Sequence, residues 1–201
     1  MGRLELQFAV DTNFVDDPSP AAQELRAARE AGWVRLFRTD VMDTEIGKAT
    51  DPEKRSHLLS LSGKYVEQYG PVVWGHSRWD HAVWGSEEDA ERLDRAIAVM
   101  FPGSARDSIV PNNLRDAMHV ATAIRYGMNG LVTRNERGLL KKSTEIADAF
   151  DGFVVATPDE VLETVDRFKS KWLARDVRPP REELDLADAS LYQPGEDRGI
   201  E

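Results

Sequence analysis

Short apolar runs alternate with longer amphipathic stretches along the first part of the chain. Residues 4–10 become continuously apolar toward Val10, which predicts a buried strand. A helical pattern over 18–31, a second apolar run over 33–37 and a helix that carries Glu45 continue the alternation. Strand, helix, strand, helix in this order is typical of a parallel sheet covered by helices. We therefore expect an α/β fold.

The rest of the chain continues this pattern after one interruption. Apolar residues recur at helical spacing from Ala117 to Met128, which makes this the clearest helix of the sequence. Two short apolar runs predict buried strands at 130–133 and 153–156. The sequence predicts helices over 56–69, from Ser86 to Pro102, from Pro111 to Gly127, over 137–150, and from Thr157 onward.

Two segments do not follow the alternation of strands and helices. Residues 70–86 form an insertion rich in tryptophan, and residues 171–201 combine many charges with several prolines. Such a composition buries too little apolar surface to fold alone, so we expect a C-terminal arm or tail. The remaining chain, 1–170, has the length of one domain with a substantial core.

The overall composition excludes several kinds of site. The 201 residues include no cysteine, which excludes disulfides, thiolate zinc sites and cysteine nucleophiles and fits a reducing cytosol. No run of about 18 apolar residues occurs, so we expect a cytoplasmic protein with no membrane partner. The net charge of −10 argues against strong passive binding to nucleic acid. It does not exclude cleavage at an acidic site that has first bound a cation.

Four stretches place a carboxylate or a carboxamide where a strand or helix is expected to begin or end. Asp11 follows the first strand, and Asn135 follows the strand at 130–133. Glu45 and Asp116 lie near the starts of two helices. If the strand ends line one edge of a sheet, these side chains converge there, as the ligands of a divalent-metal nuclease site do.

Several of these stretches together resemble the PIN-domain family of metal-dependent nucleases, which includes the VapC-like toxins of toxin–antitoxin pairs. Residues 8–13, Phe-Ala-Val-Asp-Thr-Asn, are similar to the family's first strand with its leading aspartate. Residues 116–127 followed by 130–135 resemble its helix and Leu-Val-Thr strand signature. Glu45 stands where the family places a glutamate early in its second helix. The resemblance covers about residues 4–165.

The resemblance implies a three-layer α/β/α fold with a central parallel sheet and Mg²⁺ or Mn²⁺ at the carboxyl ends of its strands. It implies that Asp11, Glu45 and Asp116 are the catalytic residues and that Asp11 and Asp116 bind the metal directly. Glu45 would complete the set of metal ligands, directly or through a water, with Asn135 as a fourth. The residues expected to support the ligands or contact phosphate are Thr12, Asn13, Thr133 and Arg134.

The leading hypothesis for the function is an endoribonuclease that hydrolyses RNA phosphodiester bonds, with the toxin of a toxin–antitoxin pair as one form of it. The implied partners are an RNA substrate, an antitoxin protein and a second copy of the chain. The alternative is a degenerate PIN domain that binds RNA or protein without cleavage, because Asn135 replaces an aspartate common in the family. A haloacid-dehalogenase-like phosphatase is a third reading, but Asn13 stands where that family needs a second acid.

Each candidate acid also has an ordinary structural interpretation. Asp11 could close a turn after its strand, and Asp116 could cap a helix together with Asn113 three residues earlier. Glu45 could pair with Lys48 on an exposed helix face. The order in which the three acids occur favours the metal site over these alternatives.

The tryptophans of the insertion also allow two interpretations. Trp74, Trp79 and Trp84 recur at five-residue intervals and could stack on unpaired bases, with Arg78 holding a phosphate. We favour the alternative, a loop or hairpin whose aromatic side chains pack on the core or in a dimer contact.

Overall fold

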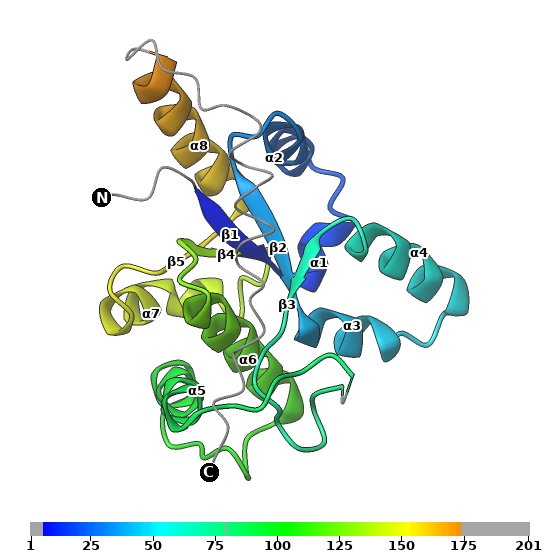
Figure 1. The fold of residues 1–201 in the computed structure, drawn as a ribbon, viewed down its shortest axis with the longest axis vertical. Coiled ribbons are helices and arrows are strands. Elements are labelled where there is room, and N and C mark those ends of the chain that lie inside the picture. Colours follow the sequence, from blue (N-terminus) through cyan, green and yellow to red (C-terminus); the bar gives the residue numbers. More distant parts are fainter. Residues whose placement is uncertain (1–5, 79, 174–201) are drawn as a thin grey trace, which may run out of the picture. The chain divides into compact units, whose positions relative to one another are not determined.

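The centre of the molecule is a parallel five-stranded sheet (Figure 1). The structure is a computed structural model that describes residues 6–78 and 80–173. The strands are β1 (Gln7–Val10), β2 (Arg35–Thr39), β3 (Val66–Gln68), β4 (Gly130–Val132) and β5 (Val154–Ala156). They lie in the order β3-β2-β1-β4-β5, and every neighbouring pair is parallel. The α/β fold with a parallel sheet that the sequence predicts is confirmed.

Helices connect the strands, and side chains cap several of their N-termini. Ser19, Asp51 and Ser86 each accept a hydrogen bond from a backbone N–H of the helix that follows, which stabilises the first turn. The helices are α1 (Thr12–Val15), α2 (Pro20–Glu30), α3 (Asp40–Gly47), α4 (Pro52–Ser62), α5 (Glu87–Met100), α6 (Pro111–Arg125), α7 (Ser143–Ala149) and α8 (Pro158–Leu173), with a 3₁₀ turn η1 at Leu140–Lys142.

Successive residues of each central strand point into two separate cores. In β1, Phe8 and Val10 pack with residues of α1, α2, α3 and α4, whereas Ala9 packs with residues of α5, α6 and α7. In β4, Val132 belongs to the first core and Leu131 to the second. The three helices of the second core lie together on one side of the sheet in Figure 1. The sheet is therefore covered on both faces, which is the expected three-layer arrangement.

Two short elements differ from the prediction. The predicted helix over 56–69 is wrong in its last part, because α4 ends at Ser62 and the chain then forms β3, which pairs with β2 along Phe37–Thr39. The segment after Asp11, expected as a turn, forms the single-turn helix α1. The other predicted elements are present with small shifts of their ends; the helix expected over 137–150 begins only after the Leu140–Lys142 turn.

The insertion at 70–86 is mostly irregular and is closed by one parallel β-bridge between Pro71 and Val83. Trp74 and Trp84 are 80% and 84% exposed, so the prediction that they pack on the core is wrong. Neighbouring polar and glycine residues keep this loop at the surface, where each indole ring finds little apolar surface to cover it. Trp79 lies outside the described residues, and a dimer contact through this loop stays a prediction.

The chain divides into two compact units, 1–165 and 166–201. Only residues 166–173 of the second unit, the last turns of α8, are described, with the rings of Phe168 and Trp172 5.9 Å apart. The expected arm or tail over 171–201 lies almost entirely outside the described residues, and the expected boundary at residue 170 stays a prediction. Within the described part of the chain, no helix is both long and apolar enough to cross a bilayer.

Candidate metal centre

The order of the strands creates a crevice at the carboxyl end of β1. This strand lies between β2 and β4, so the connections on its two sides run in opposite directions along the sheet. Asp11 directly follows β1, and its backbone N–H donates to the Val132 carbonyl of β4 at 2.9 Å. Thr133 directly follows β4. In open α/β sheets this position is where ligands bind, and it is where the sequence placed its first candidate acid.

Asp11 is buried and held by neutral hydrogen-bond donors. Its Oδ2 accepts hydrogen bonds from Thr133 Oγ1 at 2.7 Å and from Asn13 Nδ2 at 2.8 Å. Its Oδ1 accepts the backbone N–H of Thr12 at 2.6 Å, which makes Asp11 the N-cap of α1. Where the structural interpretation expected a turn after the strand, Asp11 begins a single-turn helix, and it also lines the pocket at this crevice. Thr133 and Asn13 thus both contact Asp11, and their expected roles as supports of a metal ligand stay predictions.

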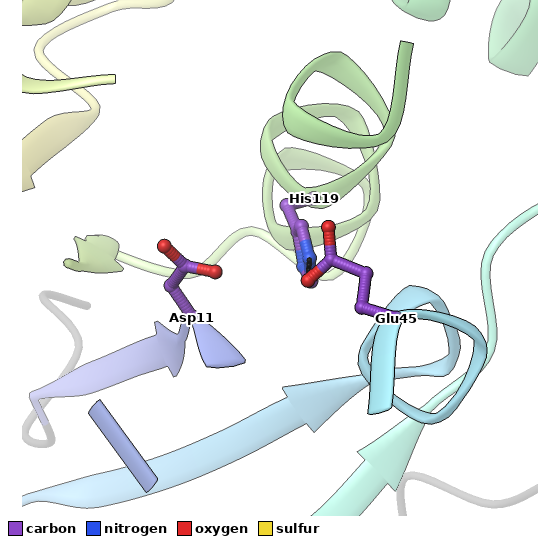
Figure 2. A group of neighbouring side chains, drawn as sticks. All are labelled: Asp11, Glu45 and His119. Carbon is purple, nitrogen blue, oxygen red and sulfur yellow. Dashed lines mark hydrogen bonds and ion pairs between the residues drawn. The ribbon is translucent and has the colours of Figure 1, made fainter. Parts of the chain in front are cut away.

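The side chain of Glu45 extends toward Asp11 from α3, and the side chain of His119 extends toward Glu45 from α6 (Figure 2). Glu45 Oε2 accepts a hydrogen bond from Thr12 Oγ1 at 2.5 Å and lies 3.4 Å from His119 Nε2. Arg115 Nε lies 3.4 Å from the other oxygen, Oε1. The interpretation of Glu45 as an exposed partner of Lys48 is therefore wrong, because its carboxylate points inward.

His119 is fully buried and is the residue of the site that the sequence analysis did not select. Its Nδ1 is hydrogen-bonded to Thr39 Oγ1 at 2.6 Å, and its Nε2 faces Glu45. Burial alone would lower the pKa of His119, but the hydrogen bond to Glu45 and the negative charges of Glu45 and Asp11 raise it to about 9. The contact between His119 Nε2 and the Glu45 carboxylate holds Glu45 in place.

Asp116 lies one turn before His119 on α6 and faces the same pocket. The pocket has a volume of about 500 Å³, and Asp11, Glu45, Asp116 and Asn135 all line it. Asn135 Nδ2 donates to Asp116 Oδ2 at 3.4 Å. Because α6 begins at Pro111, Asp116 lies inside the helix, so its interpretation as a helix cap is wrong.

The carboxyl groups of the pocket differ in how readily they ionise. Burial raises the pKa of Asp11, against the opposing charge of His119. Burial and the charges of Asp11 and Glu45 raise the pKa of Asp116 to about 6. Burial also acts to raise the pKa of Glu45, but hydrogen bonds from His119 and Thr12 and the charge of Arg115 lower it to about 2. Perturbed carboxyl groups that share one pocket are typical of functional sites.

Within the part of the chain that the structure describes, one group of acidic and imidazole side chains is compact enough to hold a metal ion. It consists of Asp11, Glu45 and His119, which each offer one ligand atom within 4.8 Å of the others. Asp116 lines the same pocket but is not a member of this group, so its direct ligation stays a prediction. Two carboxylates and a nearby third fit a hard divalent cation, which needs one or two carboxylates and completes its shell with water and phosphate.

The remaining predicted site residues have mixed surroundings. Arg134, expected to contact phosphate, donates from Nε to Asp17 at 2.9 Å and from Nη2 to Ser19 at 2.7 Å. Its Nη1 forms an ion pair with Asp159 at 3.1 Å. These bonds join the loop after β4 to the loop before α2 and leave Arg134 with acidic neighbours of its own. Asn135 Oδ1 accepts the backbone N–H of Gly138 at 2.9 Å.

Comparison with known proteins adds no name to this geometry: no protein-family model and no curated protein matches the chain. The site is defined by what the fold brings together, namely a group at the switch point of a parallel sheet that could hold a metal ion.

Proposed function

We propose that this protein is a metal-dependent endoribonuclease of the PIN-like class. The observation that carries the proposal is the convergence of Asp11, Glu45 and Asp116 on one pocket from three elements that are far apart in the sequence. The pocket lies at the switch point of a parallel sheet, and its oxygen atoms suit Mg²⁺ or Mn²⁺.

In this proposal Asp11 and Glu45 hold the cation, and Asp116 completes its surroundings directly or through water. A bound divalent cation would lower the pKa of an attacking water and neutralise charge on the scissile phosphate. Thr133 and Asn13 fix the orientation of the Asp11 carboxylate. His119 orients Glu45 through their contact, which also lowers the pKa of the Glu45 carboxyl group.

The proposal extends to partners that fit such an enzyme. RNA would enter the open side of the 500 Å³ pocket. An antitoxin protein would act by covering this pocket, and a second copy of the chain would associate through surface outside it. The exposed Trp74 and Trp84 of the insertion offer apolar area for either contact.

Asn135 supports a second candidate function, binding of RNA or protein without cleavage. Its carboxamide oxygen already accepts the backbone N–H of Gly138, and its nitrogen faces Asp116. This packing is tight, since a Cβ at position 138 would lie 2.7 Å from Asn135 Nδ2. Asn135 thus stabilises the loop after β4 and adds no negative charge to the pocket, which weakens the hold on a second cation.

The two functions are separated by cleavage of single-stranded RNA by the full chain in Mn²⁺, in EDTA and after Asp116→Asn. The nuclease proposal predicts cleavage that EDTA abolishes and that Asp116→Asn lowers about 100-fold or more, because an acid near the metal is lost. The matched control is Asp148→Asn, which removes a carboxylate exposed on α7 and should leave the rate unchanged.

Three results would overturn the nuclease proposal. These are no cleavage in Mn²⁺, cleavage that persists in EDTA, and equal rates for wild type and Asp116→Asn. No cleavage combined with RNA binding, measured by fluorescence anisotropy, would establish the second candidate in its place.

A further inference from the structure

Arg115 is a buried cation with hydrogen-bonding capacity that the protein does not use. It is 6% exposed and lies on α6, next to Asp116. Its Nη2 donates to Asn112 Oδ1, and its Nε has only the 3.4 Å contact with Glu45. Nε and Nη1 have no hydrogen-bond partner among the described residues. A buried guanidinium with unused donors costs free energy unless another group accepts them.

The unused donors belong to a side chain that lines the candidate metal pocket. Arg115 lines it together with Lys48, which follows α3, and Lys54 of α4. Lys48 is exposed, so its ammonium group can turn toward a ligand without rebuilding the core. The pocket therefore has cations beside its carboxylates, as a site that must hold both a metal ion and an anion requires.

The tryptophan-rich insertion lies close to the same cations. Burial and the charges of Lys48 and Arg115 lower the pKa of His76, which belongs to this insertion. His76 Nδ1 is also buried without a hydrogen-bond partner among the described residues.

A comparison with Arg134 shows why Arg115 is the better candidate for binding an anion. Each arginine is adjacent in sequence to a residue that lines the pocket, Arg115 to Asp116 and Arg134 to Asn135, but Arg134 is bonded to Asp17, Ser19 and Asp159. Arg115 has one neutral partner and one distant carboxylate. An anion entering the pocket would have to break ion pairs to reach Arg134, whereas it would satisfy free donors on Arg115.

We infer that Arg115, assisted by Lys48, forms a subsite that binds a phosphate group of the substrate beside the candidate metal centre. This inference rests on the proposed function for the identity of the substrate, since it deepens the same site. Nε–H and Nη1–H point in different directions, so a phosphate oxygen can accept from either one while Nη2 keeps its bond to Asn112, and the lysine adds a mobile second charge. Both an internal phosphodiester and a terminal phosphate present this chemistry.

The test measures binding of phosphate without metal and without cleavage. The full chain, in EDTA at pH 7 and constant ionic strength, is titrated with inorganic phosphate while the Arg115 Nε–H resonance is followed by NMR. We expect a saturable shift of this resonance that chloride does not produce. Two further titrations use pentathymidine with a 5′-hydroxyl and with a 5′-phosphate, and they show whether the subsite accepts an internal diester or a terminal phosphate.

Variants assign the binding to the two cations. Arg115→Gln should weaken phosphate binding about tenfold or more, because it removes a charged hydrogen-bond donor. Arg115→Lys should be intermediate, since it keeps the charge and loses the donors held in fixed directions by the planar guanidinium. For the variants, the shifted backbone amide resonances of the pocket replace the Arg115 signal. The matched control is Arg95→Gln, an exposed arginine on α5 whose guanidinium lies over the Phe150 ring, and binding should change less than twofold.

Lys48→Gln keeps the inference testable if Arg115 variants do not fold, because Lys48 is exposed. It should weaken phosphate binding about threefold, as expected for one partly screened charge. No saturable shift in the wild type, or equal weakening by Arg115→Gln and Arg95→Gln, overturns the subsite. The titration contains no metal, so its result is independent of the cleavage assay. Absence of phosphate binding together with Mn²⁺-dependent cleavage would overturn only the subsite, and phosphate binding without cleavage would overturn only the nuclease proposal.

Discussion

Two clusters of buried charge lie close together in this fold, and they are built differently. One is the candidate metal centre described above. The other, here called the paired network, joins β2, β3, α3 and the insertion. The paired network consists of Arg38, Asp43, Glu67, Arg78 and His81.

In the paired network each carboxylate contacts two basic side chains. Asp43 pairs with Arg38 and, at 3.0 Å, with Arg78. Glu67 lies 2.9 Å from Arg38 and 3.0 Å from His81. These contacts fix the irregular insertion to the edge strand β3, where few backbone hydrogen bonds are available to hold it. The network therefore has a structural role.

In the candidate metal centre the carboxylates are left with weaker partners. Asp11 receives hydrogen bonds from neutral groups, and Glu45 has its charged neighbours only at 3.4 Å. Asp116 has Asn135 Nδ2 at 3.4 Å and a pKa raised to about 6. Charge that the fold buries without neutralising it raises the free energy of the folded protein. The two clusters thus differ in how far their carboxylates are paired within the described residues.

The largest effect is expected from breaking the paired network. Arg38→Met removes a shared partner of Asp43 and Glu67, whose side chains are only 7% and 8% exposed. Two buried carboxylates would then each lack a cationic partner, which should lower the free energy of unfolding by about 3 kcal/mol. Urea denaturation measures this loss. Arg95→Met, at an exposed site, is the control and should cost about 0.5 kcal/mol; a loss below about 1 kcal/mol for Arg38→Met would contradict the structural role.

Removing a carboxylate charge from the candidate metal centre should stabilise the metal-free protein, whereas breaking the paired network should destabilise it. Because the folded pKa of Asp116 is about 6 and its ordinary value is 3.8, the folded state binds the proton more tightly. Wild-type stability should therefore fall as the pH rises from about 4 to about 6 and stay lower above that range. In EDTA at pH 7, Asp116→Asn should raise the free energy of unfolding by about 2 kcal/mol and leave it unchanged near pH 3.

The matched variant for this prediction is Asp43→Asn in the paired network. Its side chain pairs with Arg38 and Arg78, so losing the charge should destabilise the protein at pH 7. Urea denaturation across pH 3 to 8 in EDTA compares the two variants. The comparison between the clusters would not hold if both substitutions changed stability with the same sign.

Most of the fold could be predicted because its signals are local and long enough to read. The apolar run ending at Val10 and the helical spacing from Ala117 give strand and helix without knowledge of contacts. β3 could not be predicted, since Val66–Gln68 has only three residues and its side chains are partly exposed. Its conformation depends on pairing with β2, which the sequence does not display.

The site was predictable only in part, for a related reason. Asp11, Glu45 and Asp116 are acids that the sequence pattern places near expected ends of strands or helices, and a carboxylate at such a position suggests a functional role. His119 lies on the buried face of an apolar helix, where a histidine looks like one more core residue. Its position three residues after Asp116 and four after Arg115 places all three on neighbouring faces of α6. This spacing was the sequence signal that could have pointed to His119. The contacts of His119 with Glu45 and Thr39, which place it at the site, are visible only in the structure.

The smallest of these effects concerns Asn135, the one position where the centre lacks an expected charge. Asn135→Asp keeps an oxygen for the Gly138 N–H but replaces the donor that faces Asp116 with a second carboxylate oxygen. Mn²⁺ affinity, measured by isothermal titration calorimetry, should rise about tenfold, equivalent to about 1.4 kcal/mol. The metal-free protein should lose about 1 kcal/mol of stability, because like charges then meet in the pocket. Gln23→Glu adds the same charge on exposed α2 and should leave the Mn²⁺ affinity unchanged. If Asn135→Asp leaves the Mn²⁺ affinity unchanged, position 135 does not face the cation. If the variant binds Mn²⁺ more tightly and is less stable without metal, the carboxylates of the centre are incompletely neutralised in the metal-free protein.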